Sequence, residues 1–436
     1  MSGADGVDGL TNGSGGVNGH HNGPSEYSIP HETAKILREG ILENPLNERV
    51  LPRDAKKHAD LITYEGSDLP TLPINWRFAE SVSALKGLEA AVVNVLLERK
   101  YNVPAAKVTI NTDHAQLFVM SALLWQLDVE GKQSLSASSF SSAEGRKQLE
   151  QYFPDADLHG ANSSTYVGAA TSIYKTKDDR YFHLHGSMDA RPTLRSVGLP
   201  EQNTQVDYDE AVKIIGDAVN QYTAEEIQDI ATNQYKQAGT IAYSTEEYKA
   251  SEHGKDNEHI GLFEIRHQTY PAQKPSWWPD SPLTSAKRPL AGLKVVELTR
   301  VIAGPAVGRG LAELGASVMR ITSKTVTDMS ILHIDLNHGK WNADLNLREE
   351  ADREKLRELV RDADVFLQGY RPHVLDKYGF GEEGVLDLVK DRERGIIYAR
   401  ENCYGWLGPW VERTGWQQIS DAVSRCLLHR LQQCCC

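Results

Sequence analysis

The last third of the chain alternates short apolar runs with amphipathic segments, and this alternation constrains the fold more than any other feature. Apolar runs typical of strands lie at 293–298, 317–321, 364–367 and 395–399. Helical spacing lies between them, at 305–314, 349–361 and 382–390. Strands and helices that alternate with short links form βαβ units around a parallel sheet. We therefore expect an α/β fold, a parallel sheet with flanking helices.

The preceding half has a different pattern and predicts an α+β arrangement. Helical spacing is found at 32–44, 81–100, 114–127 and 207–237, with a strand at 108–110 and a Ser-rich loop at 131–144. The segment 171–186 alternates around a polar turn, which predicts a β-hairpin. Five prolines and two tryptophans between 270 and 289 indicate a linker between the two halves.

These patterns divide the chain into five parts. They are a disordered leader (1–25), the α+β half (26–269), the linker (270–288), the α/β part (289–423) and a Cys-rich tail (424–436). The leader has almost no apolar residues, so it lacks the apolar core of a signal peptide. No run approaches the roughly 18 apolar residues that cross a bilayer. We expect a cytoplasmic protein without a membrane partner.

The net charge of −13 argues against a nucleic-acid-binding surface. A polyanionic ligand would then need a local basic patch. Seven lysines and arginines lie between 285 and 325, with two glutamates among them. Such a run is more often a solvated surface, so it is compatible with a polyanionic ligand but does not by itself predict one.

The link between the first expected strand and helix of the α/β part, residues 297–310, is rich in glycine. Ligands of open α/β sheets bind at the carboxyl ends of strands, where helix N-termini offer free N–H groups to anions. Gly304, Gly308 and Gly310 lack the spacing of the dinucleotide fingerprint, and no Gly-Lys-Ser/Thr follows. The link therefore predicts either an anion or nucleotide site or a purely structural turn.

Five blocks follow one another in this part of the chain. They are 289–305 with 311–318, 336–341, 363–375, 404–409 and 415–422. Together they resemble the opening half of CoA-transferase family III, the CaiB/BaiF family, with Trp341 in place of a usual Arg. Residues from about 75 to 270 resemble the family's later half more weakly. The resemblance implies a CaiB/BaiF-like but incomplete fold, with a degenerate later half placed first.

The resemblance also implies a ligand and a site. Coenzyme A would be a substrate, not a permanently bound cofactor, and would move between an acyl-CoA and a small carboxylic acid. The CoA contacts that it implies are Val301, Ile302, Ala303, Lys324, Lys340, Gly369, Tyr370, Arg371 and Lys377. Lys324 enters as a substitute, because the family's basic residue after the second strand falls at Ser323. Family members are interlocked dimers, which implies a homodimer.

The family nucleophile is an aspartate that opens the long helix of the later half and forms an anhydride with the acyl group. This chain has Ser81 there, beside Glu80, which is a weak candidate. In the C-terminal part, the family's aspartate would fall beyond the residues that resemble the family. That resemblance ends near Val423, and we interpret the residues after it as an aberrant tail. We therefore expect a CoA-transferase that is impaired, in the sense that its usual nucleophile is absent.

Two alternatives remain open. The missing aspartate favours a catalytically inactive subunit that binds CoA or regulates a partner. An α-methylacyl-CoA racemase-like isomerase is less favoured, because Trp416 occupies the place of that enzyme's His and cannot abstract a proton.

Two further features predict no site. His183 and His185 alternate onto one face of a strand, but no third metal ligand accompanies them. Four of the five cysteines lie in the last eleven residues, without zinc-finger spacing. We expect neither a metal centre nor a disulfide framework.

Overall fold

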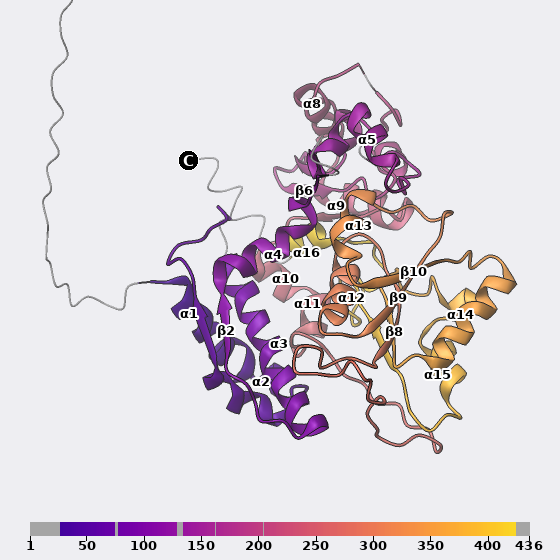
Figure 1. Ribbon diagram of the computed structural model, residues 1–436. Helices are drawn as coiled ribbons and strands as arrows, with labels where there is room; N and C mark the ends of the chain where they lie inside the picture. Colours follow the sequence, from indigo (N-terminus) through magenta and orange to yellow (C-terminus); the bar gives the residue numbers. More distant parts are fainter. Residues whose placement is uncertain (1–26, 75–76, 129–133, 162, 204, 424–436) are drawn as a thin grey trace, which may run out of the picture.

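The computed structural model describes residues 27–423 except 75–76, 129–133, 162 and 204. Three groups of elements are visible: α1–α4 with β2 on one side, the sheet of β8–β10 with its helices on the other, and α5, α8 and β6 above them (Figure 1). The predictions for the leader 1–25 and the tail 424–436 lie outside the described residues. Within the part described, no helix is both long and apolar enough to cross a bilayer.

The first group consists of helices around a two-stranded parallel sheet. Its elements are α1 (Ile29–Lys35), η1 (Ile36–Leu42), α2 (Pro45–Glu48), η2 (Arg53–Leu61), β1 (Ile62–Glu65), α3 (Phe78–Tyr101), β2 (Val108–Asn111) and α4 (Thr112–Leu124). Asn102 ends α3 in the left-handed conformation that is common after a helix. The expected helix at 81–100 and strand at 108–110 are confirmed. The helix expected at 114–127 ends three residues early, because Gln126–Asp128 forms strand β3.

The second group contains an antiparallel sheet of β5, β6 and β7. Its elements are β3 (Gln126–Asp128), β4 (Ser134–Ser136), η3 (Ala137–Ser141), α5 (Ala143–Glu150), α6 (Thr165–Ala169), β5 (Ser172–Lys175), β6 (Tyr181–Leu184), α7 (Arg191–Ser196), α8 (Tyr208–Val219), α9 (Ala224–Gln228), η4 (Asp229–Gln234), β7 (Gly239–Ile241), α10 (Thr245–Ala250) and α11 (Glu252–Asn257). The expected hairpin at 171–186 is confirmed as β5–β6.

Two expectations for this group were wrong in part. The segment 131–144 is not simply a loop, because β4 pairs with β3 and a 3₁₀ turn follows. The helix expected over 207–237 is interrupted after Val219, where Thr223 starts α9 with a capping box.

The third group is the α/β part, and all five of its strands are parallel in the order β10-β9-β8-β11-β12. Its elements are β8 (Lys294–Leu298), α12 (Ala303–Glu313), β9 (Ser317–Thr322), α13 (Ser330–Leu336), β10 (Lys340–Asp344), α14 (Glu350–Asp362), β11 (Val365–Gln368), η5 (Asp376–Tyr378), α15 (Glu382–Val389), β12 (Ile397–Arg400) and α16 (Gln417–Val423). The expected parallel sheet with flanking helices is confirmed, and α13 and β10 are elements that were not predicted.

Alternate side chains of the central strands face two cores, as the pleat of a strand requires. Val296 and Phe366 pack with residues of α14 and α15 on one face. Val295 and Val365 pack beside α12 on the other, where Leu96 of α3 also contributes. The helices α14 and α15 lie across the sheet from α12 and α13 (Figure 1).

The chain leaves β8 toward β9 and β10 on one side and returns to β11 and β12 on the other. The strand order therefore reverses at β8, and loops that follow neighbouring strands diverge there. Such reversal points are where open parallel sheets bind ligands, outside the carboxyl ends of the strands.

Candidate functional site

A pocket of about 130 Å³ lies at the carboxyl ends of β8, β9, β10 and β11. Its walls include Leu298, Thr322, Ser323, Thr325, Asn346, Arg348, Tyr370, Leu375, Lys377 and Tyr378. These residues end the strands or lie in the segments that follow them, so the pocket occupies the reversal point of the sheet. Of the link 297–310, where the sequence predicts an anion or nucleotide site, Leu298 lines this pocket.

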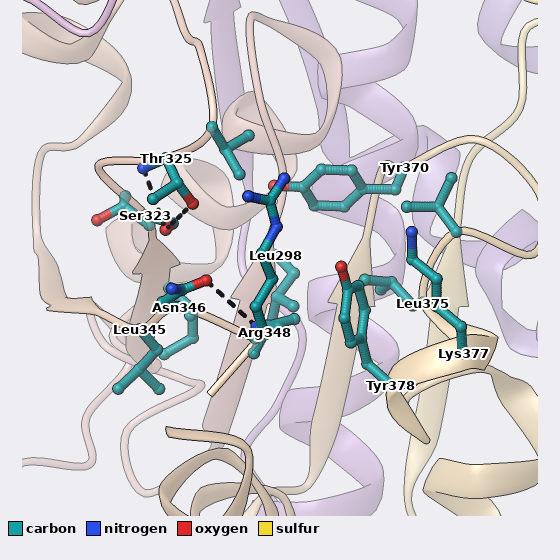
Figure 2. A pocket seen from close by; sticks show the side chains of 15 residues that line it. Leu298, Ser323, Thr325, Leu345, Asn346, Arg348, Tyr370, Leu375, Lys377 and Tyr378 are labelled. Atoms are coloured by element: carbon teal, nitrogen blue, oxygen red, sulfur yellow. Dashed lines mark hydrogen bonds between the residues drawn. The ribbon is translucent and has the colours of Figure 1, made fainter. Parts of the chain in front are cut away.

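The charges of the pocket wall are of one sign. Among the fifteen residues that line it, the charged ones are Arg348 and Lys377. The Arg348 side chain rises between Ser323 and Thr325 on one side and Tyr370 and Tyr378 on the other (Figure 2). Two cations beside hydroxyl groups and aromatic rings suit a ligand with phosphates and a flat apolar part.

Arg348 was missed from the sequence. It follows β10, and its backbone N–H donates to Asn346 Oδ1 at 3.2 Å, which fixes the turn after that strand. Since β10 was not recognised, nothing marked this residue as one that follows a strand. Its spacing of four residues beyond Asp344, the end of β10, is the signal that could have found it.

Two of the implied CoA contacts, Tyr370 and Lys377, line the pocket. The Tyr370 backbone N–H donates to Gln368 Oε1 at 2.8 Å, and the Arg300 guanidinium lies 5.2 Å from its ring centroid. Burial raises the pKa of Tyr370, so its hydroxyl stays protonated at neutral pH. Lys377 Nζ lies 4.9 Å from the centroid of Tyr378, which keeps the ammonium over the pocket edge.

Gly369, which precedes Tyr370 of the pocket wall, occupies a position with little room for a side chain. Its N–H donates to the Leu298 carbonyl at 3.1 Å. A Cβ at this position would lie 2.6 Å from Glu401 Oε1, closer than side chains approach one another. The family's Asn before the aromatic residue could not occupy this place while Glu401 keeps its position.

Arg371 and Lys324 lie outside the pocket wall. Arg371 Nη1 reaches the Lys236 carbonyl at 3.5 Å, in the second group of elements. The Lys324 side chain is 91% exposed, and its backbone N–H donates to Asp344 Oδ1 at 3.1 Å. Ser323, which precedes Lys324, does line the pocket.

Val301, Ile302 and Ala303 form the turn from β8 into α12. Ile302 and Ala303 are exposed, and Ala303 begins the helix. The next N–H, that of Gly304, donates to Glu401 Oε1 at 3.1 Å. Burial raises the pKa of Glu401 although this hydrogen bond acts in the opposite direction.

The Lys340 side chain is fully buried and does not line the pocket. Its Nζ lies 2.8 Å from Glu297 Oε2 and donates to the Pro305 carbonyl at 2.8 Å. Burial lowers its pKa despite the favourable charge of Glu297. Gly308 makes room for this pair, because a Cβ there would lie 1.8 Å from Glu297 Oε2. The structure thus places the ammonium beneath α12, where it holds β8, β10 and the helix together.

Glu80 is buried at the start of α3, while Ser81 is exposed. Tyr27 Oη donates to Glu80 Oε1 at 2.5 Å, and Arg77 Nε lies 3.1 Å from the same oxygen. Burial and the hydrogen bond to Glu80 raise the pKa of Tyr27 to about 12. The carboxylate is therefore engaged by Arg77 of its own segment and by Tyr27, which precedes α1.

Trp416 packs between the second and third groups. Its ring stacks on His185 with centroids 5.9 Å apart, and its Nε1 donates to Ser187 Oγ at 3.1 Å. His183 also stacks on His185, with ring centroids 5.9 Å apart. In the described part of the chain, no cluster of three His, Cys, Asp or Glu side chains could hold a metal.

The profile of CoA-transferase family III matches residues 290–429. Acetyl-coenzyme A transferase nodX of Hypoxylon pulicicidum is 49% identical over 401 residues, which are 91% of this chain and 66% of the relative. An acyl-CoA transferase of Gibberella moniliformis is 34% identical over 410 residues, 92% of this chain and 68% of the relative. The chain belongs to CoA-transferase family III.

The family likeness extends across both halves of the chain, since these two alignments cover more than nine tenths of it. The chain spans about two thirds of the length of the same relatives. Among solved structures, a CaiB/BaiF family protein of Brucella suis is similar over 31% of this chain and 39% of its own, with 33% identity and a TM-score of 0.29.

Proposed function

We propose that this family III chain binds coenzyme A at the carboxyl edge of its parallel sheet and acts in CoA transfer between an acyl-CoA and a small carboxylic acid. The observation that carries the proposal is the pocket at the strand reversal, whose charged wall residues are Arg348 and Lys377. Relatives named for acetyl-CoA with oxalate, and for succinyl-CoA with glutarate, support small acids as the substrate class.

In the proposed complex the nucleotide occupies the pocket. Arg348 and Lys377 meet the phosphates, and Tyr370 or Tyr378 packs against a flat apolar surface of the ligand. The pantetheine arm then follows the exposed turn of Ile302 and Ala303. CoA enters and leaves as a substrate, so the proposal includes no permanently bound cofactor.

We propose the family's carboxylate route for the chemistry. A carboxylate oxygen attacks the thioester carbonyl, an anhydride forms, and the CoA thiolate leaves. The thiolate then attacks the anhydride carbonyl that comes from the enzyme's carboxylate. This step gives an enzyme–CoA thioester and releases the first acid. The second acid reverses both steps, so one thioester is exchanged for another without net hydrolysis.

Transfer by this chain is proposed to be impaired, because the helix position of the nucleophile is Ser81. Glu80 is a weak substitute, since Arg77 and Tyr27 already engage its carboxylate. The same facts favour the second candidate, an inactive subunit that binds CoA. The racemase alternative gains no support, because the Trp416 indole at the racemase His position packs against His185.

We also propose a cytoplasmic homodimer with the domain division given by the sequence. Large apolar side chains on α3 and α4 are exposed, among them Leu85, Leu123 and Leu124. An apolar surface of this kind suits burial in an interface. Sedimentation velocity would show a species of twice the monomer mass, and a monomer at all concentrations would contradict the proposal.

Exchange of isotope-labelled acids with acyl-CoA tests the function. The wild-type chain and Glu80→Gln are compared, together with calorimetric CoA binding for both. Exchange that Glu80→Gln abolishes would assign the nucleophile to Glu80. Binding without exchange would support the inactive subunit, and the absence of both would contradict the proposed function.

Arg348→Ala is expected to weaken CoA binding by about 10- to 100-fold, because a charge-assisted hydrogen bond contributes about 1.5–3 kcal/mol. Isothermal titration calorimetry measures the dissociation constant. Arg361→Ala is the matched control, since this arginine pairs with Glu354 on the outer surface of α14. Equal affinities for the two variants would contradict a role of Arg348 in the ligand site.

A further inference from the structure

Val301 has a backbone conformation that a β-branched residue rarely adopts. Its φ is +68°, in the left-handed region, and its place is the turn between β8 and α12. Such a conformation costs about 1–3 kcal/mol and persists only where the surroundings impose it. Something in the structure must therefore hold this residue.

The Asp328 carboxylate accepts a hydrogen bond from the Val301 backbone. The Val301 N–H donates to Asp328 Oδ1 at 3.1 Å, and the Met329 N–H donates to the same oxygen at 2.8 Å. The other oxygen, Oδ2, accepts from Arg320 Nη2 at 2.8 Å and lies 3.0 Å from His333 Nε2. Asp328 is 6% exposed, so it is a buried carboxylate with both oxygens engaged.

The charge state of Asp328 is maintained by its neighbours. Burial alone would raise its pKa, but the His333 hydrogen bond and the charges of His333 and Arg320 outweigh this and lower it. An ionised carboxylate is the stronger acceptor for a backbone N–H. Asp328 is therefore suited to hold the Val301 amide at neutral pH.

The segment that carries Asp328 also borders the pocket. Thr325 and Val326 line the wall, and the Thr327 carbonyl accepts from Arg300 Nη1 at 2.9 Å. Arg300 in turn lies 5.2 Å from the ring centroid of Tyr370. One loop thus touches the nucleotide pocket and fixes the two residues that open the turn into α12.

We propose that Asp328 is a positioning residue that holds Val301 in the left-handed conformation and thereby presents the Ile302–Ala303 turn to the pantetheine arm of CoA. The inference rests on the proposed CoA site and deepens it. Asp328 itself lies behind the turn and acts through Val301. A purely structural carboxylate that only neutralises Arg320 would instead affect stability, with no preference for one end of the ligand.

Three variants separate these roles: Asp328→Ala, Val301→Gly and the double variant. Glycine adopts positive φ without strain, so it removes the need for a side chain that holds the turn. Two ligands are used, CoA and phospho-ADP, the nucleotide part of CoA without its pantetheine arm. Calorimetry gives both affinities, and thermal unfolding of each variant reports whether it is folded.

Asp328→Ala is expected to bind CoA about tenfold more weakly than the wild type and phospho-ADP equally well. The double variant is expected to recover most of the CoA affinity. Equal losses for the two ligands, or no recovery in the double variant, would overturn the inference. If the wild type bound neither CoA nor phospho-ADP, this result would instead overturn the proposed CoA site and the inference with it.

A second measurement needs neither ligand nor activity. Hydrogen exchange of a peptide that spans 299–304 should accelerate in Asp328→Ala, because the Val301 N–H loses its acceptor. Asp328→Asn is the matched control, since its amide oxygen can still accept from the Val301 N–H although the charge is lost, and its exchange should stay close to that of the wild type. If the alanine variant does not fold, Asp328→Leu replaces it, because leucine also removes the acceptor. Unchanged exchange in the variant without an acceptor would show that Asp328 does not hold the turn.

Discussion

Replacement of Lys340 by alanine is expected to lower the free energy of unfolding by about 3–5 kcal/mol, because it leaves the Glu297 carboxylate buried without its partner. Both side chains are fully inaccessible, and the Lys340 ammonium also donates to the Pro305 carbonyl. The loss would be large for a protein whose total stability is about 5–15 kcal/mol. Urea unfolding followed by circular dichroism measures it.

Lys324→Ala is the matched control, since its side chain is 91% exposed and its removal should change stability by less than about 0.5 kcal/mol. The double variant Lys340→Met with Glu297→Gln removes both charges and should recover much of the loss. If Lys340→Ala were as stable as the control, the buried ion pair of Lys340 and Glu297 would not exist in solution. The experiment also decides between a binding and a structural role for Lys340.

Acid is expected to destabilise the contact between the second and third groups of elements through His183 and His185. Burial lowers the pKa of each from 6.5 to about 4, and for His185 the charge of His183 adds to this effect. At pH values between about 4 and 6.5, these histidines bind protons in the unfolded chain but not in the folded chain. Stability is therefore fully present above about pH 7 and falls as the pH drops toward 4.

Each histidine contributes a slope of up to about 1.4 kcal/mol per pH unit within this window. The variant His183→Gln with His185→Gln should have a flatter dependence of the urea midpoint on pH, because it has no group to protonate there. His259→Gln, at an exposed position, should keep the wild-type slope. Identical slopes for the two variants would show that the buried histidines are already accessible to protons.

Most of the α/β part could be predicted from its apolar runs, because buried strands and amphipathic helices leave strong periodic signals. β10 could not. It is an edge strand that pairs only with β9 among the described strands, and Trp341 and Asn342 are exposed, so no apolar run marks it. Because β10 was not predicted, Arg348 was also missed, since its place in the pocket depends on where that strand ends.

Part of the pocket wall could be predicted from the sequence. Tyr370 and Lys377, which the resemblance implies as CoA contacts, line the pocket, since they follow a strand that the sequence revealed. Lys340 was expected to contact CoA because the family resemblance implies it, but its side chain is fully buried. Its burial depends on the space that Gly308 leaves for Glu297, which no local pattern encodes. Asp328 could not be predicted from the sequence for a similar reason, because its proposed role depends on the backbone angle of Val301.

The contacts between the halves have a consequence for how the chain folds. Lys100 pairs with Asp280, 180 residues later, and Trp416 donates to Ser187 across 229 residues. At translation rates of about 5–20 residues per second, these partners emerge roughly 10–45 s apart. Early helices must wait on the ribosome with uncovered apolar surface. We therefore expect maturation of this protein to be slow and to depend on chaperones.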